Sequence, residues 1–421
     1  MTGKIHIIGA GLAGLSCAVR LSDAGKQVAL YEAARMAGGR CRSYFDSTLG
    51  LTIDNGNHLL LSGNIAALDY AKRIGTSDAL IGPETSIFEF MDLSTGAQWR
   101  LRPNASRLPW WIFLADRRVP QTSALDYLDA AKLLFAKPTA TIDETMRCSG
   151  ALYEKLWRPV LLSALNTEPK EASASLAGAV LRETLAAGGN ACRPLFARKG
   201  LGHAFVEPAL RKLDQDGVAI KFGARLRQLV IDNERVVTLR FGDEDVPLSA
   251  HDKVVFAAPA WSAQELIPGL DAPDAHRAIL NIHFKMPPPA GLPLFMGLVN
   301  GLSEWLFAFD DRLSVTISGA DRLMDAPREK LAAQVWAEVE KAIGRFKTSD
   351  LASSPPPWQI VKEKRATFAA TPEQEARRPG AKTHWANLFL AGDWTATGLP
   401  ATIEGTIRSG YLAAKLASSP P

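Results

Sequence analysis

The pattern of apolar residues near the N-terminus predicts a strand, a glycine turn, a helix and a second strand. Residues 4–8 form a short β-type run, and residues 27–31 form another. Between them, Leu12, Leu15 and Val19 recur at helical spacing, and Gly25 stands where a glycine commonly follows the end of a helix. This order of elements indicates an α/β fold that begins with a strand–helix–strand unit.

The rest of the chain alternates between helical and β-type patterns. Residues 108–165 have helical spacing, for example at Tyr127, Ala131 and Leu134, and residues 326–346 read as an amphipathic helix. Residues 217–259 and 279–320 contain short apolar runs typical of strands. The chain ends with a strand at 388–391 and a helix at 403–416. Because similar elements open and close the chain, we expect one domain built from discontinuous segments.

Composition narrows the function classes. The chain has 421 residues, with 48 Lys and Arg against 44 Asp and Glu, so its net charge of +4 is small for a nucleic-acid binder. Hydrophobic residues make up 47% and charged residues 22%, which excludes a long disordered chain. Four scattered cysteines without a CxxC pair argue against a zinc site or a disulfide framework. We therefore expect a reducing, cytoplasmic location, and no apolar run reaches the ~18 residues of a membrane span.

The glycine turn carries the first chemical signal. The residues from Gly9 to Gly14 spell G-x-G-x-x-G between a strand and a helix, and Glu32 ends the next strand 18 residues after Gly14. In this context Gly9 permits the tight turn, Gly11 lets a pyrophosphate approach the backbone, and Gly14 allows close packing. The helix N-terminus favours phosphate, and the Glu32 carboxylate can accept hydrogen bonds from ribose hydroxyls. The pattern predicts a dinucleotide site.

Three further segments contain residues suited to a bound cofactor. Arg35 and Arg40 flank paired glycines, including Gly39, which allow a turn close to a phosphate. Residues 54–58 are rich in polar turn formers, so a plain turn is an equally good interpretation. Gly392 and Asp393 follow a strand, where the Asp can accept from a hydroxyl group.

Residues 400–405 and 108–114 carry two weaker signals. Pro400 and Thr402 suit the start of a helix whose N-terminus could face a cofactor ring. Aromatic and apolar side chains lie among several arginines in the other segment, at Trp110, Trp111, Ile112 and Phe113. This mixture is typical of a peripheral membrane contact at the cytoplasmic face, although burial in a core explains it equally well.

These residues together resemble the amine-oxidase and phytoene-desaturase flavoprotein superfamily. Within it, residues 54–61, the segments 156–159 and 164–167, and Lys364-Arg365-Ala366-Thr367 are similar to the squalene-associated FAD-dependent desaturase group. The resemblance covers essentially the whole chain. It implies FAD as the cofactor, held by the following residues: Gly9, Gly11, Leu12, Ala13, Gly14, Glu32, Arg35, Gly39, Arg40, Gly56, Asn57, His58, Leu226, Gly392, Asp393, Thr402 and Ile403.

The resemblance also implies individual roles and a domain division. Leu226 would contact adenine through its backbone, residues 56–58 would lie near the flavin ring, Asp393 would hold the ribityl chain, and Thr402 with Ile403 would lie at the pyrimidine end. A Rossmann-like FAD domain would comprise residues 1–64, 195–262 and 384–421. A β-sheet substrate domain would comprise 65–107 and 263–383, and residues 108–194 would form a helical cap.

The implied reaction is the reductive removal of the hydroxyl group of hydroxysqualene, in squalene and hopanoid biosynthesis, with an external reductant for the flavin. Such a reaction needs an apolar site and an acid that helps the hydroxyl leave as water. The candidate acids are His58 and Glu404, because both are expected beside the flavin.

Three alternatives stay open from the sequence. A carotenoid- or squalene-type desaturase would transfer hydride in the opposite direction with the same cofactor. An amine oxidase should have an aromatic residue just before the last Glu-Gly, where Thr402 and Ile403 stand here. A non-catalytic prenyl-binding protein on the same fold would need no flavin, and the intact Gly11, Glu32 and Asp393 disfavour it.

Overall fold

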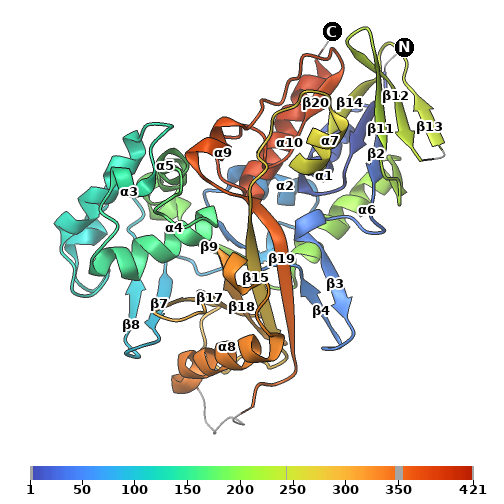
Figure 1. Ribbon diagram of the computed structural model, residues 1–421. Coiled ribbons are helices and arrows are strands. Elements are labelled where there is room, and N and C mark those ends of the chain that lie inside the picture. Colours follow the sequence, from blue (N-terminus) through green and yellow to red (C-terminus); the bar gives the residue numbers. More distant parts are fainter. Residues whose placement is uncertain (1–2, 243, 347–353, 420–421) are drawn as a thin grey trace.

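The computed structural model describes residues 3–242, 244–346 and 354–419. Figure 1 shows three regions: a sheet with helices near both termini, long strands through the centre, and a group of short helices on one side.

A five-stranded parallel sheet forms the first region, with the order β10-β2-β1-β14-β20. Its strands are β1 (Ile5–Ile8), β2 (Val28–Glu32), β10 (Ala219–Phe222), β14 (Lys253–Phe256) and β20 (Leu388–Leu390). The middle strands are apolar and buried, as expected for strands covered on both faces. All five come from the three segments that we expect to form the FAD domain.

Helices cover one face of this sheet and a small meander covers the other. On the first face, α1 (Leu12–Asp23) packs against α10 (Ile403–Ser418), and α2 (Ile65–Arg73) and α6 (Glu207–Gln215) join the same apolar cluster. On the second face lie α7 (Ala260–Leu266) and the antiparallel strands β11 (Gln228–Asp232), β12 (Arg235–Phe241) and β13 (Glu244–Pro247).

A seven-stranded sheet forms the second region, with the order β19-β15-β18-β17-β16-β7-β8. The strands are β7 (Phe88–Asp92), β8 (Gln98–Leu101), β15 (His276–Phe284), β16 (Phe295–Val299), β17 (Trp305–Ala308), β18 (Leu313–Ile317) and β19 (Trp358–Phe368). Side chains alternate between its two faces. One face packs on α8 (Arg328–Ile343), and most of the other packs on the short helices.

Short strands connect these two regions. The hairpin β3 (Ser43–Asp46) and β4 (Leu51–Asp54) extends from the nucleotide end, and β9 (Pro194–Ala197) pairs with both β5 (Leu59–Leu61) and β6 (Leu80–Ile81). As a result, residues 56–58 lie between the hairpin and β5.

The third region, residues 108–194, is mostly helical but contains little regular α-helix. It contains α3 (Ile142–Thr145), α4 (Arg158–Leu165), α5 (Ala174–Glu183) and 3-10 segments such as Ala124–Phe135. No helix within the described residues is long and apolar enough to cross a membrane.

Candidate functional site

The glycine turn lies between β1 and α1. At two of its glycines, Gly9 and Gly14, the packing is too close for any side chain. Gly9 has φ +108°, and a Cβ added there would come within 2.8 Å of the Ala257 carbonyl oxygen. A Cβ on Gly14 would lie 1.9 Å from the Gly9 oxygen. These two glycines therefore let the helix start directly over the end of the strand.

Gly11 differs from these two because its surroundings are open. No heavy atom lies within 4 Å of a Cβ built on Gly11, the cap residue of α1. Gly11 provides no side-chain cap, and the first turn of α1 contains no acidic residue. The first N–H groups of a helix have no partner within it, so Leu12, Ala13 and Gly14 present donors and a positive dipole end to this opening. This is a cradle that a phosphate fits.

Glu32 connects the glycine turn to the end of β2. Its carboxylate accepts the N–H of Ala10 at 2.7 Å and the N–H of Ala34 at 2.8 Å. Each carboxylate oxygen can accept more than one hydrogen bond, so Glu32 is held in place and can still accept from ribose hydroxyls.

The second glycine loop lies across the first. The N–H of Gly38 donates to the Ala10 oxygen at 2.8 Å, and a Cβ on Gly39 would lie 3.5 Å from the Cα of Gly11. Arg35 is exposed on the same loop. The backbone of both loops therefore borders one opening.

Arg40 and Asp393 meet, although 353 residues separate them in the sequence. Arg40 donates to the Asp393 carboxylate at 2.6 Å and to the Ala366 carbonyl at 2.6 Å. Asp393 follows Gly392, whose φ is +145°, and is only 4% exposed. The ion pair raises the pKa of Arg40 despite its burial. Arg40 thereby joins the glycine loops to the end of β20.

Arg378 is a positioning residue that the sequence patterns do not reveal. Its buried guanidinium donates to the carbonyl oxygens of Asp393 and Thr395 and to the hydroxyl of Thr397. These bonds fix the loop after β20. Nothing in the local sequence marks Arg378, because the loop it holds lies on another element.

Gly56, Asn57 and His58 lie against the interior strands β15 and β18 of the seven-stranded sheet. Asn57 donates to the hydroxyls of Ser314 at 2.7 Å and Thr316 at 3.0 Å. His58 lies near Arg40, and burial together with that positive charge lowers the pKa of His58 to about 4. The imidazole of His58 is therefore neutral at pH 7.

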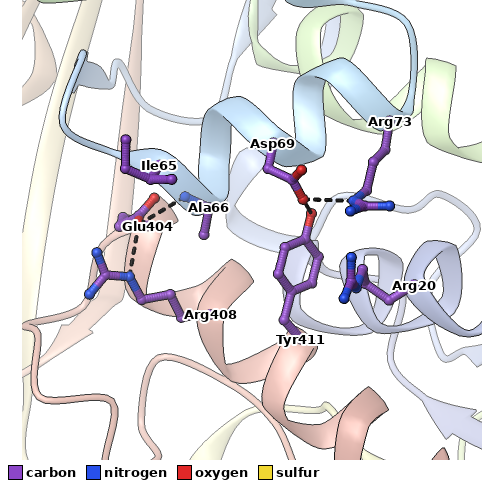
Figure 2. A pocket seen from close by; sticks show the side chains of 8 residues that line it. All are labelled: Arg20, Ile65, Ala66, Asp69, Arg73, Glu404, Arg408 and Tyr411. Atoms are coloured by element: carbon purple, nitrogen blue, oxygen red, sulfur yellow. Dashed lines mark hydrogen bonds and ion pairs between the residues drawn. The ribbon is translucent and has the colours of Figure 1, made fainter.

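Glu404 is placed differently from His58. Its carboxylate, 2% exposed, accepts the N–H groups of Ala66 and Ala67 at the start of α2 and the guanidinium of Arg408 at 2.8 Å. Figure 2 shows Glu404 between Ala66 and Arg408. These donors hold the carboxylate at the N-terminus of α2, where it caps the helix.

The open pocket beside Glu404 has a volume of about 530 Å³. Its lining consists of residues from α1, α2 and α10: Arg20, Ile65, Ala66, Asp69, Arg73, Glu404, Arg408 and Tyr411. Arg73 pairs with Asp69 and Asp23, and Arg408 pairs with Glu404 and Glu183. The pocket is thus an ion-paired junction between helices.

Three other residues are expected to contact FAD: Thr402, Ile403 and Leu226. They lie on elements that border the two sides of the parallel sheet. Thr402 caps α10 by accepting the Gly405 N–H at 3.1 Å, and Ile403 is buried behind it. Leu226 is 6% exposed, and neither its N–H nor its C=O takes part in a main-chain hydrogen bond within the described residues. A buried backbone of this kind is available to an adenine ring.

These features fit FAD. The open cradle at Gly11, the held carboxylate of Glu32 and the free backbone of Leu226 suit a pyrophosphate, a ribose and an adenine. Asp393 and the loop at 56–58 lie next to Arg40, where the flavin half of FAD would bind.

The aromatic segment of the cap divides into exposed and buried residues. Trp110 and Phe113 are 60% and 62% exposed, whereas Trp111 and Ile112 are 4% and 5% exposed and pack in the cap core. The burial interpretation therefore holds for Trp111 and Ile112, whereas a membrane contact through Trp110 and Phe113 stays a prediction.

Comparison with known proteins gives consistent results. A family model described as flavin containing amine oxidoreductase matches residues 12–292 and 296–417. The chain is 55% identical to a hydroxysqualene dehydroxylase of Rhodopseudomonas palustris, over 99% of this chain and 98% of that protein. It is 52% identical to one of Sinorhizobium fredii, over 100% and 99%. Cyclohexylamine oxidase from Brevibacterium oxydans has a similar fold, with a TM-score of 0.70 at 18% identity over 99% of each chain.

Proposed function

We propose that this chain reductively removes the hydroxyl group of hydroxysqualene. It belongs to the flavin containing amine oxidoreductases and, among them, to the hydroxysqualene dehydroxylases. It is an FAD-dependent oxidoreductase. The observation that carries the proposal is 55% identity across 99% of the chain. A desaturase, an amine oxidase and a prenyl-binding protein are not favoured.

FAD, when bound and reduced, supplies a hydride. The overall change is that hydroxysqualene gains this hydride at carbon and loses its hydroxyl with one proton as water. This chain binds the cofactor through the two glycine loops and Glu32, and it excludes water with the apolar cluster between the cap and the seven-stranded sheet.

The direct test is anaerobic. The purified protein is reduced, hydroxysqualene is added, and flavin absorbance is followed while squalene is measured by chromatography. We expect flavin reoxidation with stoichiometric squalene. A reduced flavin that persists without squalene would contradict the function, and oxidised enzyme would then be tested with polyenes and amines.

Of the two candidate acids, His58 is better placed for the hydroxyl. Glu404 is occupied as the cap of α2, whereas His58 is half-buried beside Arg40. Because the pKa of His58 is about 4, only a small fraction is protonated at pH 7. That fraction rises about tenfold for each pH unit down to the pKa.

We therefore predict that the single-turnover rate of reduced enzyme increases as the pH is lowered from 8 to 6, and that His58→Ala abolishes this increase. The rate is measured by rapid mixing under argon. Glu404→Gln is the comparison. Retention of C–O cleavage in both variants, with FAD bound, would exclude both residues as the acid.

A peripheral membrane contact would bring the apolar substrate to the enzyme. The cap patch consists of the exposed residues Leu108, Trp110, Phe113, Leu114, Leu125, Leu128 and Phe135. Arg107 is exposed beside it. Exposed aromatic and aliphatic side chains with a nearby cation suit an anionic bilayer surface.

We predict that changing Trp110 and Phe113 together to Ser reduces binding to vesicles containing anionic lipid at least tenfold. Sedimentation with the vesicles measures binding. Phe45→Ser is the matched control, because Phe45 is 68% exposed on β3, away from the cap. Equal binding by the double variant and the wild type would exclude this patch as the contact.

A further inference from the structure

One face of the seven-stranded sheet is divided into a polar half and an aromatic half. On β15 and β18 the side chains Asn281, His283, Ser314 and Thr316 alternate with apolar residues that pack toward α8. On the neighbouring strands the same face carries aromatic residues that pack toward the cap: Phe90, Trp99, Phe295, Trp305 and Phe307. The two halves therefore differ in chemistry on one continuous surface.

The boundary between the halves runs between β18 and β17. Thr316 pairs directly with Trp305, and Ser314 pairs with Phe307. Directly opposed residues on neighbouring antiparallel strands hold their side chains about 5 Å apart. A ligand at this boundary can thus contact hydroxyl groups and aromatic rings at the same time.

The polar half contains donors and acceptors without partners. Asn281 is 1% exposed, and its Oδ1 accepts from Asn57 and from Thr316. Its Nδ2, with two N–H groups, has no partner within the described residues, and neither has the Oδ1 of Asn57. Buried polar atoms are normally paired, so these atoms indicate a ligand or a water molecule.

The unpaired atoms lie beside the loop that bears His58. A Cβ built on Gly56 would be 3.3 Å from the Nδ2 of Asn281. Immediately after this loop, Leu59 joins the aromatic cluster, and β5 pairs with β9, whose Phe196 ring lies 5.8 Å from that of Phe307. The loop therefore contacts the polar half, and the strand that follows it joins the aromatic cluster.

We propose that Asn57, Asn281 and Thr316 form the subsite for the hydroxyl group of the substrate, and that the aromatic half receives the adjoining isoprenoid chain. The inference rests on the proposed function and deepens it. A long hydrocarbon with a single hydroxyl needs an apolar surface with one local group of polar atoms. The amide of Asn281 offers donors to the hydroxyl oxygen, and the Asn57 oxygen offers an acceptor for its proton.

The test compares two ligands that differ in the hydroxyl group. Oxidised enzyme with FAD bound is titrated with hydroxysqualene and with squalene in detergent, and the change in flavin absorbance gives both dissociation constants. We expect wild type to prefer hydroxysqualene. Asn281→Leu, which keeps the branching and the number of side-chain heavy atoms, should reduce this preference about tenfold while squalene binds as before.

Two further variants make the result specific. Thr316→Val keeps the shape of the side chain and should also lower the preference for hydroxysqualene. It can replace Asn281→Leu as the test if that variant loses its flavin. Phe307 lies on the aromatic half, so Phe307→Leu should weaken the binding of hydroxysqualene and squalene equally. An unchanged preference in both polar variants, or a wild type without preference, would overturn the subsite.

Failure of the subsite can be distinguished from failure of the function. If reduced wild type converts hydroxysqualene to squalene and the polar variants keep their preference, only the subsite is wrong. If reduced wild type forms no squalene, the proposed function is wrong and the subsite falls with it.

Discussion

At the scale of single residues, the proposed cofactor site is held together by charged groups from distant parts of the chain. Arg40 contacts Asp393 and Ala366, while Arg378 holds the loop that follows β20. The sequence motifs mark Arg40 and Asp393 as candidate site residues, because glycines or a strand end stand next to each of them. Arg378 and Asn281 have no such neighbours, and their partners become visible only when the chain is folded.

Glu404 provides a prediction about stability at this scale. Glu404→Gln should lower the free energy of unfolding by about 1–2 kcal/mol, because a neutral amide accepts less strongly from two N–H groups at a helix N-terminus. Urea denaturation measures the change. Glu183→Gln is the matched control, since Glu183 pairs with the same Arg408 but does not cap α2. Equal losses in the two variants would show that the ion pair, not the cap, is responsible.

At the scale of elements, α1 and α10 pack closely against each other. A Cβ on Gly410 would lie 2.2 Å from the Ser16 Oγ and 2.4 Å from the Ala13 carbonyl oxygen. Only a glycine lets the two backbones approach so closely. This contact supports the first turn of α1, where the phosphate cradle begins.

We predict that Gly410→Ala displaces α10 from α1, lowers the melting temperature by several degrees and weakens FAD binding at least tenfold. Thermal melting and flavin titration measure the two effects. Gly344→Ala is the control, because Gly344 follows α8 with no heavy atom within 4 Å of its Cβ position. Normal FAD affinity in the Gly410 variant would contradict this account of the packing.

The elements differ in how well the sequence predicts them. The expected helix at 326–346 is α8, and the strands around the glycine turn lie within one or two residues of their expected positions. The eleven-residue strand β19 is not predicted, because Lys362, Glu363, Lys364 and Arg365 interrupt any apolar alternation. Its long pairing with β15 places it in the sheet in spite of those charges.

At the scale of the whole molecule, buried titratable groups set the pH dependence of stability. Burial lowers the pKa of His6 and His58 to about 4 and that of His283 to about 3. Unfolded histidines bind protons below about pH 6.5, so acidification below that value favours unfolding. Burial raises the pKa of Glu304 to about 7, so the folded state holds a proton that the unfolded state releases above 4.5. Its contribution to stability is therefore lost as the pH rises from 4.5 through 7.

We predict that Glu304→Gln removes the decline in stability that Glu304 causes between pH 4.5 and 7. The free energy of unfolding is measured by urea denaturation at each pH in that interval. Gln at this position can still accept the Ser318 N–H, which Glu304 accepts at 2.8 Å. An identical decline in wild type and variant would assign the pH dependence to other groups.

The parallel sheet also determines when the protein can first hold its cofactor. Strand β14 lies between β1 and β20, and α10 covers α1, so the first and last described parts of the chain share one sheet and one helix pair. On a ribosome, β20, Asp393 and α10 emerge after every other described element, and domains of a nascent chain fold only when their segments are available. The glycine turn is synthesised before these elements but must wait for them. FAD loading should therefore follow the synthesis of α10, and chains released before that point should carry no flavin.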